Sequence, residues 1–262
     1  MTHLTIPLWP DGAPGALGDR EADIPSITVY EPAGSKNGAA VLVFPGGGYT
    51  ARMDYEGEAY AEWLARSGYT CFVVNYRLSP DGYSLPVIFQ DAVRAVRWAR
   101  CRAAEYGFSA AQIAVIGSSA GGHLCANLSV HWDAGDPAAA DPVERCSSRP
   151  DAAVLCYPAI YMRAAKYLSR LFGGQAPARS EIDHYCADRH VRPDTPPAFL
   201  FHTAADQLVS AVHSLRYARE LQRAGVPYEL HVYERGAHGV ALGNGHPWTI
   251  ECLRWLGERF GL

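Results

Sequence analysis

The chain has 262 residues and a formal net charge of −4, with 48% hydrophobic and 19% charged residues. This composition is typical of a soluble globular protein with a sizeable core, and it excludes a disordered or collagen-like chain. The 23 Lys and Arg residues are scattered along the chain, which argues against nucleic acid as a partner. Apolar stretches such as 39–44 have the length of a strand, far below the roughly 20 residues that a membrane-spanning helix needs.

The N-terminal segment, 1–20, is rich in Pro and Gly and has neither a basic start nor an apolar run of the signal-peptide type, so we expect a cytoplasmic protein. The chain has seven cysteines, which are widely spaced and form no Cys-x-x-Cys pair. No histidine stands beside them at the spacing of a metal ligand. We therefore expect reduced thiols and no structural zinc bound by these cysteines.

Short apolar runs rich in Val, Ile, Phe and Tyr alternate with segments of helical periodicity along the chain. Runs that are apolar throughout are typical of strands buried on both faces of a parallel sheet. The predicted strands are 27–30, 39–44, 70–75, 113–116, 152–156, 198–202 and 229–233, and the predicted helices are 56–67, 87–106, 121–131, 209–224 and 247–260. This alternation predicts an α/β fold with a mostly parallel, twisted sheet and helices on both faces.

The chain contains no internal repeat or low-complexity linker, and we predict one domain over 1–262. Two stretches, 133–150 and 159–197, break the alternation of strands and helices. Long connections in compact domains often act as lids or binding loops. We expect 159–197 to form a lid or to line a pocket, whereas 133–150 is equally compatible with a solvated excursion.

The strongest motif is Gly-Ser-Ser-Ala-Gly at 117–121, which has the pattern Gly-x-Ser-x-Gly with Ser119 at its centre. The pentapeptide alone is weak evidence, but it follows a predicted strand and opens a predicted helix. A sharp turn from strand to helix strains the serine and exposes its Oγ at the carboxyl edge of the sheet. We predict that Ser119 is a nucleophile; the alternative is that the glycines serve only close packing of strand and helix.

A serine hydroxyl needs a base that accepts its proton and a third group that orients the base. Asp206 lies in a loop after one predicted strand, and His238 lies in a glycine-flanked loop after the last. The chain order Ser, Asp, His, with each residue just past a strand, predicts a catalytic triad of Ser119, Asp206 and His238. The rival base is His246, and the rival acids in the long connection are Asp183, Asp188 and Asp194.

Acyl transfer also needs hydrogen-bond donors for the oxyanion of the tetrahedral intermediate. The sequence Pro-Gly-Gly-Gly-Tyr at 45–49 directly follows a predicted strand, and consecutive glycines let backbone N–H groups approach a ligand closely. We predict that the donors are the N–H groups of Gly47, Gly48 and Ala120, and that Tyr49 forms part of the wall that binds substrate. A phosphate-binding role is disfavoured because the Gly-x-Gly-x-x-Gly and Gly-Lys-Ser/Thr patterns are missing.

With these motifs, the sequence resembles the α/β-hydrolase esterase/lipase family, especially its acetyl-xylan-esterase-like and bifunctional carbohydrate-esterase group. Hormone-sensitive-lipase-like esterases are more distant, and they begin the oxyanion motif with His where this chain has Pro45. The resemblance covers nearly the whole chain, from Leu-Trp-Pro-Asp-Gly at 8–12 to His-Gly at 238–239. It implies the α/β-hydrolase fold and a serine esterase without metal or organic cofactor, acting on short acyl esters such as acetylated xylan-type sugars.

The leading hypothesis is therefore a serine carboxylesterase for short-chain acyl esters, with a small-molecule or oligosaccharide ester as substrate. An arylformamidase or a small serine peptidase would use the same triad, because nothing in the triad distinguishes an ester from an amide. A catalytically silent binding protein on a hydrolase scaffold is a third hypothesis. The complete set of Ser119, Asp206 and His238 disfavours it.

Overall fold

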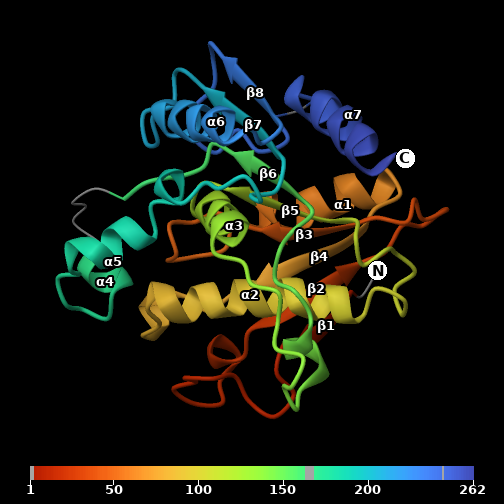
Figure 1. Ribbon diagram of the computed structural model, residues 1–262, viewed down its shortest axis with the longest axis vertical. Coiled ribbons are helices and arrows are strands. Elements are labelled where there is room, and N and C mark those ends of the chain that lie inside the picture. The colour runs from red at the N-terminus through yellow and green to blue at the C-terminus, as the bar shows by residue number, and fades with distance from the viewer. Residues whose placement is uncertain (1–2, 163–167, 244) are drawn as a thin grey trace.

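The computed structural model (Figure 1) describes residues 3–162, 168–243 and 245–262, and its centre is an eight-stranded sheet. In the order of pairing the strands are β1 (Leu4–Pro7), β2 (Ser26–Tyr30), β4 (Thr70–Asn75), β3 (Ala40–Phe44), β5 (Ile113–Ser118), β6 (Ala152–Cys156), β7 (Ala198–Thr203) and β8 (Tyr228–Tyr233). The β1·β2 and β2·β4 pairings are antiparallel, and all the pairings from β4 to β8 are parallel. The prediction of a mostly parallel α/β sheet is confirmed.

Helices cover both faces of the sheet (Figure 1). α2 (Leu85–Cys101), α3 (Ala120–Val130) and α6 (Val212–Ala224) share one hydrophobic cluster, while α1 (Glu58–Arg66) and α7 (Trp248–Phe260) share the other. Two short helices, α4 (Leu168–Leu171) and α5 (Arg179–His184), lie at the periphery of the molecule.

The strand β3 shows why an apolar run forms the centre of such a sheet. Its residues Ala40, Leu42 and Phe44 belong to the cluster under α2 and α3, while Val41 and Val43 belong to the cluster under α1 and α7. All five are fully buried. Because side chains alternate between the two faces of a strand, a strand covered on both faces must be apolar at every position.

The structure differs from the predicted elements at several places. β1 was not predicted, because Leu4–Pro7 is short, largely exposed and ends in proline. α2 ends at Cys101, five residues earlier than predicted, and α6 begins at Val212 rather than at 209. The predicted insertion 159–197 contains α4 and α5, and its residues 163–167 lie outside the described residues.

All seven cysteines carry free thiols. None of the helices in the described ranges combines the length and the apolar character that crossing a bilayer requires. The chain direction of the parallel strands brings the carboxyl ends of β3, β5, β7 and β8 to one edge of the sheet. The loops at this edge carry the residues of the candidate site.

Candidate active site

Ser119 occupies the turn between β5 and α3 in a strained backbone conformation, with φ 52° and ψ −112°. Residues other than glycine rarely adopt positive φ, and such strain persists only where the surroundings hold it. The Ser119 N–H donates to the carbonyl oxygen of Cys156 at 3.0 Å, and its carbonyl oxygen accepts from the N–H of His123 at 3.0 Å. These bonds to β6 and within α3 fix the serine at the edge of the sheet.

The flanking glycines of the motif are required by sterics. A Cβ on Gly121 would lie 1.9 Å from the carbonyl oxygen of Phe44, and a Cβ on Gly117 would lie 2.3 Å from the carbonyl oxygen of Gly121. Both distances are far below van der Waals contact, so any larger residue would separate α3 from β3 and β5. The glycines thus serve close packing, and that packing also places Ser119 at the cavity described below.

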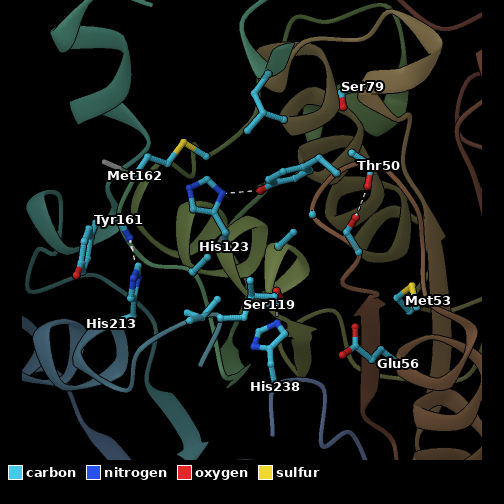
Figure 2. Close-up of a pocket in the computed structure, with 18 of the residues that line it drawn as sticks. Thr50, Met53, Glu56, Ser79, Ser119, His123, Tyr161, Met162, His213 and His238 are labelled. Atoms are coloured by element: carbon cyan, nitrogen blue, oxygen red, sulfur yellow. Dashed lines mark hydrogen bonds between the residues drawn. The ribbon is translucent and has the colours of Figure 1, made fainter. Parts of the chain in front are cut away.

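Two hydrogen bonds join the three residues of the predicted triad through His238. Figure 2 shows the Ser119 and His238 side chains beside each other. His238, in the loop after β8, receives a hydrogen bond from Ser119 Oγ at its Nε2, with a distance of 2.9 Å. Its Nδ1–H donates to Asp206 Oδ2 at 2.7 Å. This arrangement leaves the lone pair of Nε2 directed at the serine hydroxyl, as a general base requires.

Asp206 is held in a network that favours its charged form. Its Oδ1 accepts from the N–H groups of Leu208 and Val209, both at 2.9 Å. Burial acts to raise the pKa of this carboxyl, but the hydrogen bonds from His238, Val209 and Leu208 outweigh it and lower the pKa below the usual value. An ionised Asp206 can therefore orient the imidazole and stabilise it once it takes up a proton.

The rival residues are engaged elsewhere. The ring of His246 packs against Tyr233, with the centroids 4.5 Å apart. The carboxylates of the long connection are ion-paired with arginines: Asp183 with Arg189, Asp188 with Arg216 and Asp194 with Arg192.

The glycine loop after β3 presents unpaired donors beside Ser119. Gly47 has φ 127°, and a Cβ there would lie 2.3 Å from the carbonyl oxygen of Ala51, so only glycine fits this turn. Within the described ranges, the N–H groups of Gly47 and Gly48 have no hydrogen-bond acceptor. Ala120 begins α3, where the first N–H groups of a helix lack intrahelical partners. All three residues line the same cavity as Ser119.

A buried carboxylate, which the sequence did not single out, anchors this loop. Glu56 accepts a hydrogen bond from the Gly46 N–H at Oε2 (2.8 Å) and one from the Tyr157 hydroxyl at Oε1 (2.6 Å). Burial raises the pKa of Glu56, although these hydrogen bonds and the nearby His238 act in the opposite direction. Glu56 lies next to His238 in Figure 2, and it fixes the start of the loop that carries Gly47 and Gly48.

Tyr49 also lines the cavity, but its hydroxyl is already engaged. It donates to Nδ1 of His123, a residue of α3, at 2.5 Å. The Nε2–H of His123 donates to the carbonyl oxygen of Tyr185 at 2.8 Å, which fixes the tautomer. Burial lowers the pKa of His123 to about 4, so the ring is neutral at pH 7. The sequence did not show this link, because Tyr49 and His123 are 74 residues apart and meet only in the folded chain.

These residues surround a cavity of about 720 Å³. Its far wall comes from the long connection and from α6: the Tyr161 ring stacks on the imidazole of His213 with centroids 3.9 Å apart, as Figure 2 shows beside Met162. The apolar part of the lining consists mainly of Met53, Met162, Leu168, Leu171, Leu208 and Val209. A volume of this size accommodates a whole small-molecule ligand rather than only an acyl group.

The fold and the site together define a hydrolase scaffold, and comparison with known proteins identifies the family. Residues 41–242 match the family described as alpha/beta hydrolase fold, and the chain belongs to that family. The predicted fold family is therefore confirmed.

Among solved structures, the chain is similar to an acetyl ester-xyloside bifunctional hydrolase from Caldicellulosiruptor lactoaceticus. The identity is 36%, the TM-score is 0.89, and the match covers 98% of this chain and 96% of that chain. The chain is also 30% identical to an acetylxylan esterase of Xylanibacter ruminicola and 32% identical to endo-1,4-beta-xylanase B of Butyrivibrio fibrisolvens. These matches cover 85% and 84% of this chain, but they span only 45% and 35% of the two relatives.

Proposed function

We propose that this protein is a serine carboxylesterase that removes short acyl groups, acetyl in particular, from sugar or xylo-oligosaccharide esters. The observation that carries the proposal is the chain of hydrogen bonds from Ser119 Oγ through His238 to Asp206 at one end of the cavity. Its named relatives include an acetylxylan esterase and an acetyl ester-xyloside hydrolase, which supports the choice of acyl group.

In the proposed mechanism, His238 Nε2 takes the proton of Ser119 Oγ as this oxygen attacks the ester carbonyl carbon. The carbonyl oxygen becomes an oxyanion that accepts hydrogen bonds from the N–H groups of Gly47, Gly48 and Ala120. The protonated His238 then gives its proton to the leaving alcohol, and the bond from carbon to that alcohol breaks. In the second half, His238 takes a proton from a water molecule as this water attacks the acyl carbon. The bond from that carbon to Ser119 Oγ then breaks, His238 returns the proton to Oγ, and the acid leaves.

The helix α3 adds to the stabilisation of negative charge. Its N-terminus begins at Ala120, directly after the serine, and the dipole of a helix favours an anion at this end. The removal of one donor from such a site typically lowers the turnover about 10²–10³-fold.

The cavity supports a substrate with a sizeable alcohol part. An acetyl group occupies only a small part of about 720 Å³, so the remaining space fits the alcohol side of the ester. Polar groups that could contact sugar hydroxyls, including Thr50, Ser79 and His213, line this space among the apolar side chains.

The proposal is tested by steady-state hydrolysis of p-nitrophenyl esters from acetate to octanoate, together with acetate release from acetylated xylo-oligosaccharides. We expect the wild type to prefer acetate, and Ser119→Ala to lower kcat by about 10⁴-fold or more. The control is Ser118→Ala: this neighbouring hydroxyl is buried against Tyr60, away from the cavity, so the variant should remain active.

An active Ser119→Ala variant would disprove the assignment of the nucleophile. Wild type that is inert on all esters but cleaves aryl formamides or peptide amides would instead establish one of the amide hydrolases that share this triad. Esterase activity without acetate release from the oligosaccharides would retain the mechanism and reject the sugar substrate.

A further inference from the structure

Three histidines meet at the end of α3 that is remote from Ser119. His131 directly follows α3, His184 is the last residue of α5, and His190 follows the turn Ala187–Arg189. One ring nitrogen of each lies within 4.8 Å of a ring nitrogen of both others. We name these residues the histidine cluster, and none of them lines the cavity that holds Ser119.

We propose that the histidine cluster binds one divalent transition-metal ion, and that zinc is the ion it takes. Imidazole nitrogens are common zinc ligands, and three of them with one water complete a tetrahedral site. Tetrahedral ligands at zinc–nitrogen distances of about 2.0–2.1 Å stand about 3.4 Å apart, so the ring nitrogens must approach one another by up to about 1.4 Å.

The side chain that has to move is accessible. His184 is exposed, and its ring stacks on that of His131 with centroids 4.2 Å apart. Rotation about its own side-chain torsions turns a ring nitrogen toward the position that the other two rings share. This rotation needs no change of the α5 backbone, because it turns only a surface side chain.

The backbone already orients the other two rings in the manner of metal ligands. The Nε2–H of His131 donates to the carbonyl oxygen of His184 at 2.8 Å, and the Nε2–H of His190 donates to the carbonyl oxygen of Asp183 at 2.9 Å. Each bond fixes the tautomer and leaves the lone pair on Nδ1. Metal-binding histidines commonly donate their second N–H to a carbonyl or carboxylate in this way.

The charge around the histidine cluster also bears on a bound cation. Arg192 lies close enough to His131 to act on it electrostatically. The positive charge of Arg192 is partly balanced by its ion pair with Asp194 at 3.0 Å.

A bound ion would link the segment 159–197 to α3, the helix that follows Ser119. Tyr185, next to His184, accepts the hydrogen bond of His123 through its carbonyl oxygen, and His123 lines the cavity. Metal binding would thereby hold α5 against α3 and stabilise the cavity wall that contains His123. The ion would take no part in the chemistry at Ser119. The site therefore stands whether or not the proposed esterase activity is found.

The test is calorimetric titration of tag-free protein with Zn²⁺, after treatment with EDTA and removal of the chelator. We expect one ion per chain, and an affinity at least about 10-fold lower for His184→Ala and for His190→Ala. His184 is exposed, so its variant should fold normally. Zn²⁺ should raise the unfolding temperature of the wild type but not that of His184→Ala.

Two control variants exclude other sites. His3→Ala removes an exposed histidine on the N-terminal segment, and His238→Ala removes the imidazole beside Asp206, where a cation could also lodge. Both should bind Zn²⁺ like the wild type. The proposal fails if the wild type shows no saturable binding, if His184→Ala binds equally well, or if His238→Ala loses the ion.

Discussion

The hydroxyl of Tyr49 and Nδ1 of His123 lie 2.5 Å apart, and their hydrogen bond joins the glycine loop after β3 to α3. The two segments carry the proposed oxyanion donors and the proposed nucleophile. Because both residues are buried, the bond is shielded from water and holds the loop and the helix in one relative position. Tyr49 thus acts on the site through the backbone next to it.

Tyr49→Phe should lower kcat for p-nitrophenyl acetate by about 10-fold and leave KM almost unchanged. The variant keeps the ring but frees Gly48 and its N–H to shift, and donors displaced from the oxyanion lose much of their effect. Tyr55→Phe is the matched control, because Tyr55 lines the same cavity and is 45% exposed. Equal activity of Tyr49→Phe and wild type would show that the bond does not position the loop.

Asp206→Asn should lower kcat by about 10⁴-fold while the protein remains folded. The amide of asparagine can donate to Nδ1 of His238, which favours the tautomer with the proton on Nε2. A protonated Nε2 cannot accept the proton of the Ser119 hydroxyl. Steady-state kinetics measure the loss, and thermal unfolding checks the fold. Asp188→Asn and Asp183→Asn, which change the rival acids, should each keep more than half of the activity.

Gly121→Ala should destabilise the protein by about 3 kcal/mol or more, because its Cβ would lie 1.9 Å from the carbonyl oxygen of Phe44. Gly257→Ala is the counterpart in α7, where the nearest atom to a new Cβ is the carbonyl oxygen of Leu262 at 4.0 Å. This second variant should gain about 0.5–1 kcal/mol from helix propensity. Urea unfolding of both variants measures the contrast, and equal stabilities would contradict the close packing of α3 on β3.

The free energy of unfolding should fall as the pH decreases from about 6.5 to 4. Burial lowers the pKa of His123, His131 and His213 from 6.5 to about 4, so the unfolded chain takes up protons in this range and the folded chain does not. These groups cost no stability above pH 6.5; the loss grows as the pH falls from 6.5 to about 4 and does not increase further below that. The raised pKa of Glu56 works in the opposite direction near its usual value of 4.5.

His213→Asn isolates one of these contributions, since its Oδ1 can replace Nδ1 as acceptor for the Ile160 N–H. Urea unfolding between pH 7 and 4.5, in the presence of EDTA, should give a flatter pH profile for this variant than for the wild type. His3→Asn, which changes an exposed histidine, should leave the profile as it is. Parallel profiles for His213→Asn and wild type would refute the lowered pKa of His213.

The elements that the sequence predicted well are those with a strong one-dimensional pattern. All seven predicted strands are present. Strands such as β3 and β6 are buried and apolar throughout, which is the pattern that predicts them, whereas the edge strand β8 is only partly buried. The sequence predicts a start of α6 at the apolar residue Val209, which is too early. In the structure the N–H groups of Leu208 and Val209 donate to Asp206 and are not part of the helix. Hydrogen bonding of this backbone to Asp206 thus prevails over the local helical periodicity.

The sequence predicted the three candidate triad residues from their order along the chain, but not the residues that hold the site in place. Ser119, Asp206 and His238 each follow a strand, and parallel strands bring such loops together. Glu56 and His123 could not be found in this way, because their partners Tyr157 and Tyr185 are distant in sequence and contact them only in the folded chain. The sequence did not predict the histidine cluster for the same reason: His131 and His184 are 53 residues apart in the sequence.

The contributors to the site follow β3, β5, β7 and β8, so Gly47 is synthesised first among them and His238 last. While a ribosome is still extending the chain, the strands up to β6 can pair, but no base is yet available for Ser119. Activity therefore requires a chain that has been synthesised through β8 and the loop of His238, and truncated products that lack β8 should be inactive even where their remaining strands have assembled.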